Sequence, residues 1–447
     1  MWYLPKFLAL FFSLLFSAFS LQPLAFPSVS ASQVYYANLH SHTTFSDGIG
    51  TPVQAYTYAR DTAQIQVLAL TEHNHPVGSS PGLDDSLYQR LRIIADSCTQ
   101  DGFFVALAGQ EVGYLNGFGH IAIFEGPQLA PRTYDKDLLG MYDWILKQGA
   151  PAEFCHPSLD DFNNLGYYSN YDKAIALLEI LNKAVLYEDR YIHALNQGWH
   201  IGATAVQDNH QGYWGSEVNS EGKIPLTGIL ADSLTKGKIL EALKNRRTFA
   251  MEVNPPDDRI MFDFTANGYE MGEQISTSRT VINFSVNLIA KTSFKNILLF
   301  HNGTIFDSLL VNNNLCSWQT KDFPAEGRHY YFVKAIQADG DRVWSSPIWI
   351  EVLPQVSEVC AWPNPVVDKS KIVYTRDSDE ISSDIYIYDI NGNLIWKKCN
   401  AGPEEIVEWS AQNSSGEKVA NGLYLLLIEE KTSHGLERSL GKIAVKR

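Results

Sequence analysis

The feature that most constrains the fold is a regular alternation, between residues 34 and 247, of short apolar runs with longer amphipathic segments. The apolar runs are VYYANL, IQVLAL, FFVALAG, HIAIF, PAEF, IALLEIL and IGATAVQ. Runs this short suit buried parallel strands. The segments between them have the period of helices and include TPVQAYTYARDTA, DDSLYQRLRIIADSC, DKDLLGMYDWILKQG, EDRYIHALNQG and TKGKILEALKNR. The alternation predicts an α/β domain large enough for a barrel of about seven or eight strand–helix units.

The pattern changes after residue 254. Alternating apolar and polar residues replace the helical period, as in INFSVNLIA and HYYFVKAIQ, with turns such as Asn302-Gly303. This pattern predicts a β-sandwich over residues 256–353. A second all-β unit is expected over residues 354–447, where Asn391-Gly392 marks a hairpin turn. We therefore expect an α/β barrel over residues 32–255 followed by two all-β sandwich domains.

The first 31 residues have the pattern of a secretory signal peptide. Lys6 precedes about fifteen apolar residues, fewer than the ~20 that a membrane-spanning helix needs. Val29-Ser30-Ala31 then supplies the small residues of a cleavage site. We expect removal of residues 1–31 and an exported mature chain without a membrane span. A retained N-terminal anchor is the alternative.

Export makes the cysteines informative, because five of them cannot all pair within one chain. Cys360 and Cys399 flank the same C-terminal region and are the most plausible bridge. Cys155, next to His156, is expected to be a small buried hydrophobic residue.

Histidines and carboxylates lie at the ends of the apolar runs. The candidates are His40, His42, Asp47, His73, Glu111, His156, Asp208 and His210, together with His120, which starts its run instead of following it. Strand ends of a (β/α) barrel converge on one face, so these side chains are expected to meet. Imidazole and carboxylate groups together form a mixed ligand set for Zn²⁺, Mn²⁺ or Fe²⁺. The ordered set predicts a metal site.

The motifs NLHSHTTFSDG, ALTEHN, AGQEVG, GHIAIF, FCHPS and QDNH occur in this order along roughly half of the chain. They resemble the motif series of the polymerase and histidinol phosphatase (PHP) family. The resemblance implies a distorted (β/α)7 TIM-like barrel that holds a cluster of two or three metal ions.

Position by position, the resemblance assigns ligands to three ions. It implies one ion bound by His40, His42, Glu111 and Asp208, a second by Glu111, His120 and His156, and a third by Asp47, His73 and His210. Every ligand position is filled. Asn38, Glu72 and Gln207 stand where the motifs often have Asp, Asp and Ser. Of these, Glu72 is expected to alter the groups that surround the ligands.

Two further resemblances lie downstream. The stretch ILEALKNRRTFAMEV and an NG-x-x-MGE element at residues 267–273 look like the PHP branch of carbaryl hydrolase, in which a β domain follows the barrel. WPNP, IYIYDINGNLI, NGLYLL and the final K-x-x-x-K resemble the type A sorting domain of the type IX secretion system. The second resemblance implies contact with the type IX secretion machinery and a secreted or cell-surface location.

These features predict a metal-dependent hydrolase that activates water with its ion cluster. Small phosphoesters or nucleotides are the expected substrates, because cations offset the charge of phosphate oxygens. Carbamate, ester or amide hydrolysis at the same site is one alternative, and a non-catalytic surface module that holds metal is another. Asp47, Asp208 and His210 are the candidates for catalytic proton transfer.

The charge balance and a few other residues refine this hypothesis. A net charge of −15 disfavours non-specific binding to nucleic acid or anionic lipid, although a nucleotide substrate stays possible. Arg60, Arg190 and Arg247 are candidates for binding a phosphate, with solvated helix charges as the alternative. Glu179 and Asn182 end a strand run and are candidates to support ligands or bind substrate.

Overall fold

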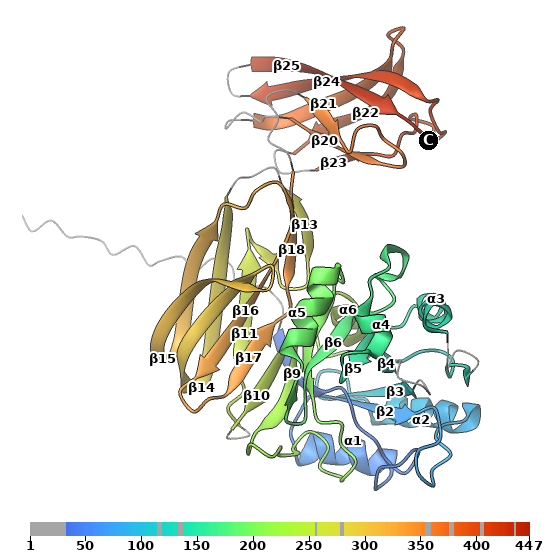
Figure 1. Cartoon of the computed structure of the whole chain (residues 1–447), viewed down its shortest axis with the longest axis vertical. Helices are drawn as coiled ribbons and strands as arrows, with labels where there is room; N and C mark the ends of the chain where they lie inside the picture. The colour runs from blue at the N-terminus through green and yellow to red at the C-terminus, as the bar shows by residue number, and fades with distance from the viewer. Residues whose placement is uncertain are drawn as a thin grey trace, which may run out of the picture. The chain divides into compact units, whose positions relative to one another are not determined.

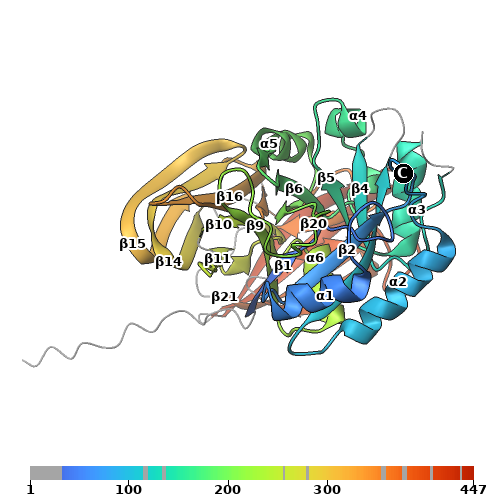
Figure 2. The same cartoon turned by 90° about the horizontal axis from the view of Figure 1, so that it is seen from below.

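The computed structural model describes residues 33–113, 119–132, 137–254, 257–277, 281–353, 359–374, 380–402, 406–432 and 435–447. The predicted signal peptide, residues 1–31, lies outside these ranges. In the part of the chain that is described, no helix is both long enough and apolar enough to cross a membrane. Figures 1 and 2 show the helices in the blue-to-green half of the chain and strands beyond it.

Seven strands of the α/β region pair side by side in the order β8-β6-β5-β4-β3-β2-β1. They are β1 (Gln33–Asn38), β2 (Val67–His73), β3 (Val105–Gly113), β4 (His120–Phe124), β5 (Ala152–Cys155), β6 (Leu177–Asn182) and β8 (Gly202–Val206). A parallel bridge between Ser41 and Asn209 joins the ends of β1 and β8, so the two outer strands of this order also meet. Every residue of β2, β3 and β6 is buried, as expected for strands covered on both faces.

One strand departs from the expected parallel arrangement. β4 is antiparallel to both β3 and β5, whereas the other pairs in this order are parallel. The prediction of a parallel strand at HIAIF was therefore wrong. Residues 114–119 are too few for the crossover of about a dozen residues that a parallel pair needs. The start of β4 consequently lies at the same edge as the ends of its parallel neighbours.

The five amphipathic segments form helices as predicted. They are α1 (Pro52–Asp61), α2 (Asp85–Cys98), α3 (Leu138–Gln148), α5 (Glu188–Gln197) and α6 (Lys236–Lys244). Thr51 forms a capping box with Gln54 at the start of α1, and Asp84 caps α2 through the backbone N–H of Leu87. The short α4 (Asp161–Leu165) and a 3₁₀ turn, η2 (Ser169–Tyr171), follow β5.

The α/β sheet continues into the β-rich region through one shared strand. β9 (Ile224–Ala231) is antiparallel to β1, and β10 (Thr248–Val253) pairs with β9 on one side and with β17 on the other. Beyond it the described residues of 257–353 form strands only. These are β11 (Met261–Ala266), β12 (Tyr269–Glu270), β13 (Gln274–Thr277), β14 (Ile282–His301), β15 (Thr304–Asp322), β16 (Gly327–Gln337), β17 (Arg342–Ser345) and β18 (Ile348–Val352). The predicted change from α/β to β is confirmed.

The C-terminal region forms a separate seven-stranded sheet in the order β22-β21-β24-β25-β19-β20-β23. Its strands are β19 (Cys360–Trp362), β20 (Ser370–Val373), β21 (Glu380–Asp389), β22 (Leu394–Ala401), β23 (Val407–Trp409), β24 (Gly422–Thr432) and β25 (Gly435–Val445). The prediction of a disulfide bond between Cys360 and Cys399 was wrong, because all five cysteines are free. β19 and β22 are separated by β25, β24 and β21, so the two thiols lie too far apart to bond.

Candidate metal centre

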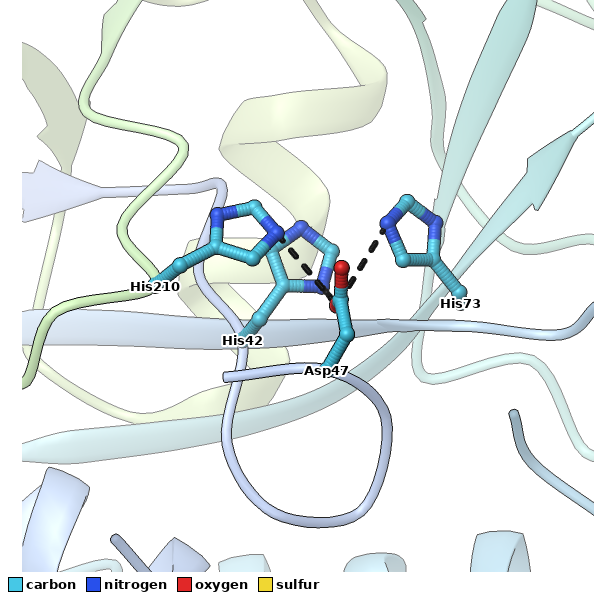
Figure 3. Close-up of side chains that lie close together, drawn as sticks. All are labelled: His42, Asp47, His73 and His210. Atoms are coloured by element: carbon cyan, nitrogen blue, oxygen red, sulfur yellow. Dashed lines mark ion pairs between the residues drawn. The ribbon is translucent and has the colours of Figure 1, made fainter. Parts of the chain in front are cut away.

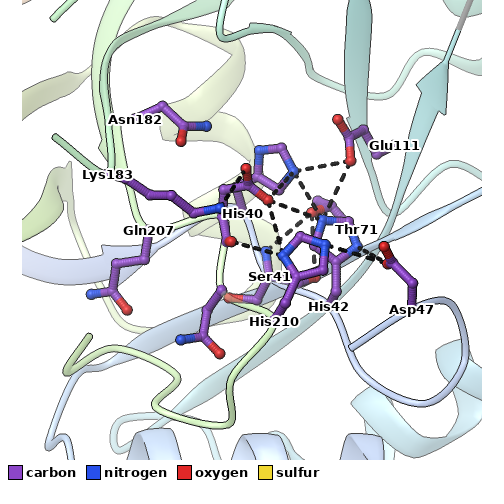
Figure 4. A network of polar contacts seen from close by, with 12 residues as sticks. His40, Ser41, His42, Asp47, Thr71, Glu111, Asn182, Lys183, Gln207 and His210 are labelled. Carbon is purple, nitrogen blue, oxygen red and sulfur yellow. Dashed lines mark hydrogen bonds and ion pairs between the residues drawn. The ribbon is translucent and has the colours of Figure 1, made fainter. Parts of the chain in front are cut away.

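The nine predicted ligands lie at one edge of the α/β sheet. Their positions follow chain order: His40, His42 and Asp47 after β1, His73 at the end of β2, Glu111 in β3, His120 at the start of β4, His156 after β5, and Asp208 and His210 after β8. His120 joins the others because β4 is reversed, which pairs it with Gly113 of β3 and Cys155 of β5. Figure 4 shows a network of polar contacts that contains His40, His42, Asp47, Glu111 and His210.

Glu111 is the centre of the buried part of the site, with its side chain 1% exposed. Its Oε2 faces three imidazole nitrogens: His73 Nδ1 at 3.0 Å, His40 Nε2 at 3.1 Å and His42 Nε2 at 3.3 Å. Its Oε1 faces two more: His120 Nδ1 at 2.6 Å and His156 Nε2 at 3.2 Å. The two oxygens of the Glu111 carboxylate thus lie next to different sets of histidines.

A second group surrounds Asp47 (Figure 3). Asp47 Oδ1 lies 3.3 Å from His210 Nε2, 3.6 Å from His73 Nε2 and 3.9 Å from His42 Nδ1. His42 and His73 each turn one ring nitrogen toward Glu111 and the other toward Asp47. A neutral imidazole has one free lone pair, so each of these rings can ligate in only one of the two groups.

The loop that carries Asp47 turns tightly against His42. A Cβ atom at Gly48 would lie 2.6 Å from the backbone carbon and oxygen of His42, so only glycine fits this turn. The Gly48 N–H donates to the Thr43 carbonyl at 3.0 Å, and the Trp214 indole donates to the His42 carbonyl at 3.0 Å. These contacts fix Asp47 beside the histidines.

Asp208 and His156 sit at strained backbone positions. Their φ angles are +44° and +31°, values that residues other than glycine adopt rarely and at a cost of about 1–3 kcal/mol. The neighbouring Asn209 carbonyl accepts from His42 N–H at 2.8 Å, and the His156 N–H donates to Glu179 Oε2 at 2.6 Å. Strain that the surroundings enforce in this way is typical of functional sites.

The donor atoms fit a divalent cation. Atoms bound tetrahedrally at ~2.0–2.1 Å lie about 3.3 Å from one another. His40 Nε2 and His42 Nε2 are 3.1 Å apart, and Asp208 Oδ1 lies 3.6 Å and 3.4 Å from them. Four sets of three or four side chains bring their ligand atoms within 4.8 Å of one another, including His40 with His42 and Glu111.

Unsatisfied polar atoms support the same conclusion. Asp47 Oδ1 and His73 Nδ1 are buried, and although charged groups lie within 3.0 to 3.3 Å of them, neither atom has a partner with hydrogen-bond geometry among the described residues. Buried polar atoms without partners are costly, and a cation would satisfy both. Imidazole with carboxylate suits Zn²⁺, Mn²⁺ or Fe²⁺.

Opposite charges shift the pKa values of the site. Burial raises the pKa of Glu111, but the charge of His40 and the hydrogen bonds from His120 and His156 outweigh it and hold that pKa well below its usual range. Burial lowers the pKa of His42, but Asp208 and Glu111 raise it to about 9. Glu111 therefore stays ionised at neutral pH and presents negative charge to a cation.

A buried carboxylate behind the ligands holds two of them in place. Glu179 Oε1 lies 2.6 Å from His40 Nδ1, which leaves His40 Nε2 to face the site. Glu179 Oε2 accepts from the Asn182 amide at 2.9 Å as well as from the backbone of His156. A carboxylate on the far nitrogen of a histidine is the usual support of a metal ligand. Of the two roles that the sequence left open for Glu179 and Asn182, the contacts favour support.

The three departures from the motif series hold loops instead of entering the ligand set. Asn38 Oδ1 accepts from the backbone of Gln207 at 3.1 Å, and Gln207 Oε1 accepts from the Gly215 N–H at 2.9 Å. Glu72 accepts from the Thr43 backbone at 3.1 Å and from the Thr43 and Ser46 hydroxyls. Glu72 therefore secures the loop that carries His42 and Asp47.

The three candidate arginines are engaged elsewhere. Arg60 pairs with its neighbour Asp61, and Arg247 pairs with Glu270 and Glu273 of the β-rich region. Arg190 donates to Asn164 Oδ1 at 2.9 Å and to the Leu159 carbonyl at 3.3 Å.

Sequence reasoning missed Lys183, whose Nζ lies 3.2 Å from Asp208 Oδ2. Its one signal in the sequence is its place two residues after the apolar run IALLEIL, which ends at Leu181.

The C-terminal region matches a known family. Residues 360–440 match the family described as a secretion system C-terminal sorting domain. This match confirms the predicted sorting domain and indicates a secreted or cell-surface location. A domain of this kind implies interaction with the type IX secretion machinery.

Other relatives are distant. An uncharacterised protein of Chlamydia pneumoniae is 25% identical over 144 residues, which cover 28% of this chain and 23% of that protein. An uncharacterised protein of Chlamydia trachomatis serovar D is 21% identical over 383 residues, which cover 75% of this chain and 60% of that protein. The chain thus spans less than two thirds of each of these relatives.

One solved structure is similar along most of its length. It is a two-domain protein from Bacteroides vulgatus, described as containing a predicted PHP-like metal-dependent phosphoesterase. The similarity has 15% sequence identity and a TM-score of 0.42 and covers 72% of this chain and 97% of that one. The proteins named here give no support to the branch of carbaryl hydrolase.

Proposed function

We propose that this chain is an exported metal-dependent hydrolase of the PHP type that acts on small phosphoesters. The observation that carries the proposal is the arrangement around Glu111, whose two oxygens face three and two imidazole nitrogens at 2.6 to 3.3 Å. A carboxylate shared in this way suits a cluster of ions better than a single ion, because each oxygen has a ligand set of its own.

The proposal assigns residues to the cluster. His40, His42, Glu111 and Asp208 hold one ion, Glu111, His120 and His156 a second, and Asp47, His73 and His210 a third. Residues 32–255 form the distorted (β/α)7 barrel that carries the site. Residues 256–353 form a β-sandwich and residues 354–447 the sorting domain. Close approach of the donor atoms supports the ligand sets. The seven paired strands support the barrel.

The chemistry follows from these groups. Bound among these side chains, divalent cations would supply activated water near neutral pH and offset the charge of an anionic substrate. Asp47 and Asp208, 22% and 18% exposed, lie on the open side of the site, where a leaving group can reach them. We assign proton transfer to Asp47, Asp208 or His210.

A metal and substrate assay of the full chain tests the proposal. Metal content is measured after loading with Zn²⁺ or Mn²⁺, and turnover is followed on phosphomonoesters, phosphodiesters, nucleotides, carbamates and aryl esters. We expect two or three ions per chain and turnover of phosphoesters that His40→Ala abolishes. His193→Ala is the matched control, because His193 lies on α5, outside the ligand set, and its ring nitrogen Nε2 is hydrogen-bonded to the Asn164 carbonyl.

Other outcomes point elsewhere. Turnover of carbamates or esters alone would assign the same site to carbon centres. Bound metal without turnover would indicate a surface module that only holds metal. A chain that binds no metal would refute the site itself.

A further inference from the structure

A lysine reaches the edge of the metal centre from the end of β6. Figure 4 shows the Lys183 side chain extending toward the histidine cluster. Its Nζ lies 3.2 Å from Asp208 Oδ2, and its side chain is 46% exposed. A lysine in this place faces both the solvent and the site.

The backbone of Lys183 is fixed in a position that directs the side chain inward. Its φ angle is +52°, in the left-handed region that lysine adopts rarely. Its N–H donates to the Val206 carbonyl at 3.0 Å, and its carbonyl accepts from the Asn219 amide at 3.2 Å. Hydrogen bonds to the end of β8 and to the loop at Asn219 therefore hold Lys183 in a backbone conformation that is unfavourable for lysine.

Asp208 divides its two oxygens between the lysine and the histidines. Oδ1 lies 3.4 Å from His42 Nε2 and 3.6 Å from His40 Nε2, while Oδ2 faces Lys183. A single carboxylate thus separates the ammonium group from the imidazole nitrogens of the cluster.

The ammonium group has unused capacity. It carries three N–H donors, and among the described residues Asp208 is its one hydrogen-bond acceptor. Burial raises the pKa of Glu217, although the hydrogen bond from the Asn209 amide and the charge of Lys183 act against it. Two donors of Lys183 are thus left for a ligand that enters from solvent.

We propose that Lys183 binds an anionic oxygen of the substrate beside the metal centre and so selects dianionic phosphomonoesters over monoanionic diesters and neutral esters. This inference rests on the proposed phosphoesterase function and deepens it. An ammonium ion next to the cluster gains most from a group with two negative charges. None of the three candidate arginines supplies this cation, because each is engaged elsewhere.

Binding of inorganic phosphate tests the inference without turnover. The probe is titrated by calorimetry into the metal-loaded full chain, its Lys183→Met variant and its Lys238→Met variant. Lys238 is the matched control because it is 41% exposed and lies 3.2 Å from Asp232, on α6 after the far end of β9. We expect Lys183→Met to weaken phosphate binding about 10- to 100-fold with unchanged metal content, and Lys238→Met to leave both unchanged.

Two results of this titration would overturn the inference. Phosphate affinity that does not change in Lys183→Met would show that the lysine does not touch the anion. Metal content that falls with phosphate affinity would show that Lys183 only positions Asp208.

Kinetics separate this inference from the proposed function. We expect Lys183→Met to lower kcat/KM about 10- to 100-fold for p-nitrophenyl phosphate and less than about threefold for bis(p-nitrophenyl) phosphate, with partial recovery in Lys183→Arg. If the wild type hydrolyses neither compound while phosphate binding still depends on Lys183, the proposed function and the substrate selection fail, and only the binding of an anion by Lys183 stands. If Lys183→Met hydrolyses the monoester as well as the wild type does, the inference fails and the proposed function stands.

Discussion

Two halves of the metal centre differ in how the fold supports them. The Glu111 half, defined as Glu111 with His40, His120 and His156, is built on strands and their first following residues. The Asp47 half, defined as Asp47 with His73 and His210, takes His73 from the end of β2 but Asp47 and His210 from the loops after β1 and β8. The carboxylates differ in exposure, 1% for Glu111 and 22% for Asp47. The histidines do not follow this division, because His120 and His156 are 31% and 28% exposed and His73 and His210 9% and 23%. Side chains of equal chemistry thus stand in different environments.

This difference shows that ligands of the same chemical type can differ in how firmly the surrounding protein holds them. In the Glu111 half, Glu179 holds His40 and the His156 backbone from behind. In the Asp47 half, Asp47 Oδ1 has no hydrogen-bond partner among the described residues. A ligand that the protein holds rigidly binds its ion with less loss of entropy. We therefore expect a tightly held ion in the Glu111 half and a more exchangeable one in the Asp47 half.

The largest effect is expected for Glu111→Gln. The change removes the one negative charge that five imidazoles share, so both oxygen-facing ligand sets lose affinity. We expect loss of most bound metal and at least about a thousand-fold lower kcat/KM, equivalent to about 4 kcal/mol. Glu252→Gln is the control, since Glu252 is equally buried but pairs with Lys223 and Arg342. If the Glu111→Gln variant retained its metal, Glu111 would not be the shared ligand of the cluster.

A smaller effect is expected for Asp47→Asn. Only the Asp47 half loses its carboxylate, so metal content should fall by about one ion per chain and activity by about a hundred-fold. Atomic absorption after dialysis against a weak chelator measures the loss. Asp172→Asn is the control, because Asp172 also pairs with a histidine, His200, at 2.8 Å. Equal metal loss in Asp47→Asn and Glu111→Gln would remove the distinction between the halves.

Glu179→Gln tests the support of the Glu111 half. The amide no longer fixes the charge and orientation of His40, and we expect metal affinity to fall about tenfold with little change in the number of ions. Competition with a chelator of known affinity gives the change. Glu188→Gln, which alters a carboxylate bonded to Trp344 at 2.7 Å, is the control. An unchanged affinity would mean that Glu179 serves the fold alone.

The smallest effect is expected for Glu153→Gln and concerns stability. Glu153 is fully buried, and burial and then the charge of Glu179 raise its pKa well above the usual range. The folded protein keeps this proton, while an unfolded chain releases it near pH 4.3. The wild type therefore loses stability relative to Glu153→Gln as the pH rises from about 4 to 7.

Calorimetric Tm values of both proteins across this pH range measure the change. The exposed Glu241→Gln should show no such trend. A difference between Glu153→Gln and the wild type that does not vary with pH would place a charged carboxylate at position 153.

Most residues of the site could be predicted from the sequence because the ligands lie at the ends of strands, which the sequence marks as the ends of apolar runs. The histidines after β1, β2 and β5 stand where an apolar run stops, and that position alone predicts a shared edge. The direction of β4 could not be predicted from the sequence, because the apolar pattern of HIAIF is the same for a parallel and an antiparallel strand. His120 was found as a candidate, but the reason it joins the others is the short connection before it.

Other features depend on contacts that no local pattern records. The place of Lys183 depends on a single backbone turn and on the distance to Asp208, which lies 25 residues further along the chain. The cysteine pairing failed because spacing in the sequence says nothing about strand order within a sheet. Glu72 was expected to alter the surroundings of the ligands, and its contacts with Thr43 and Ser46 specify how.

The shared strand β10 has a consequence for how the chain can be divided. It pairs with β9 across residues 248–253 and with β17 through Phe249, Ala250 and Met251. A chain cut after residue 255 would leave one side of β10 as a bare strand edge of unpaired amides and carbonyls. Such edges recruit other chains and aggregate. The ligand-bearing region and the strands that follow it therefore cannot be separated without exposing an edge of β10. A soluble fragment of this protein has to contain both.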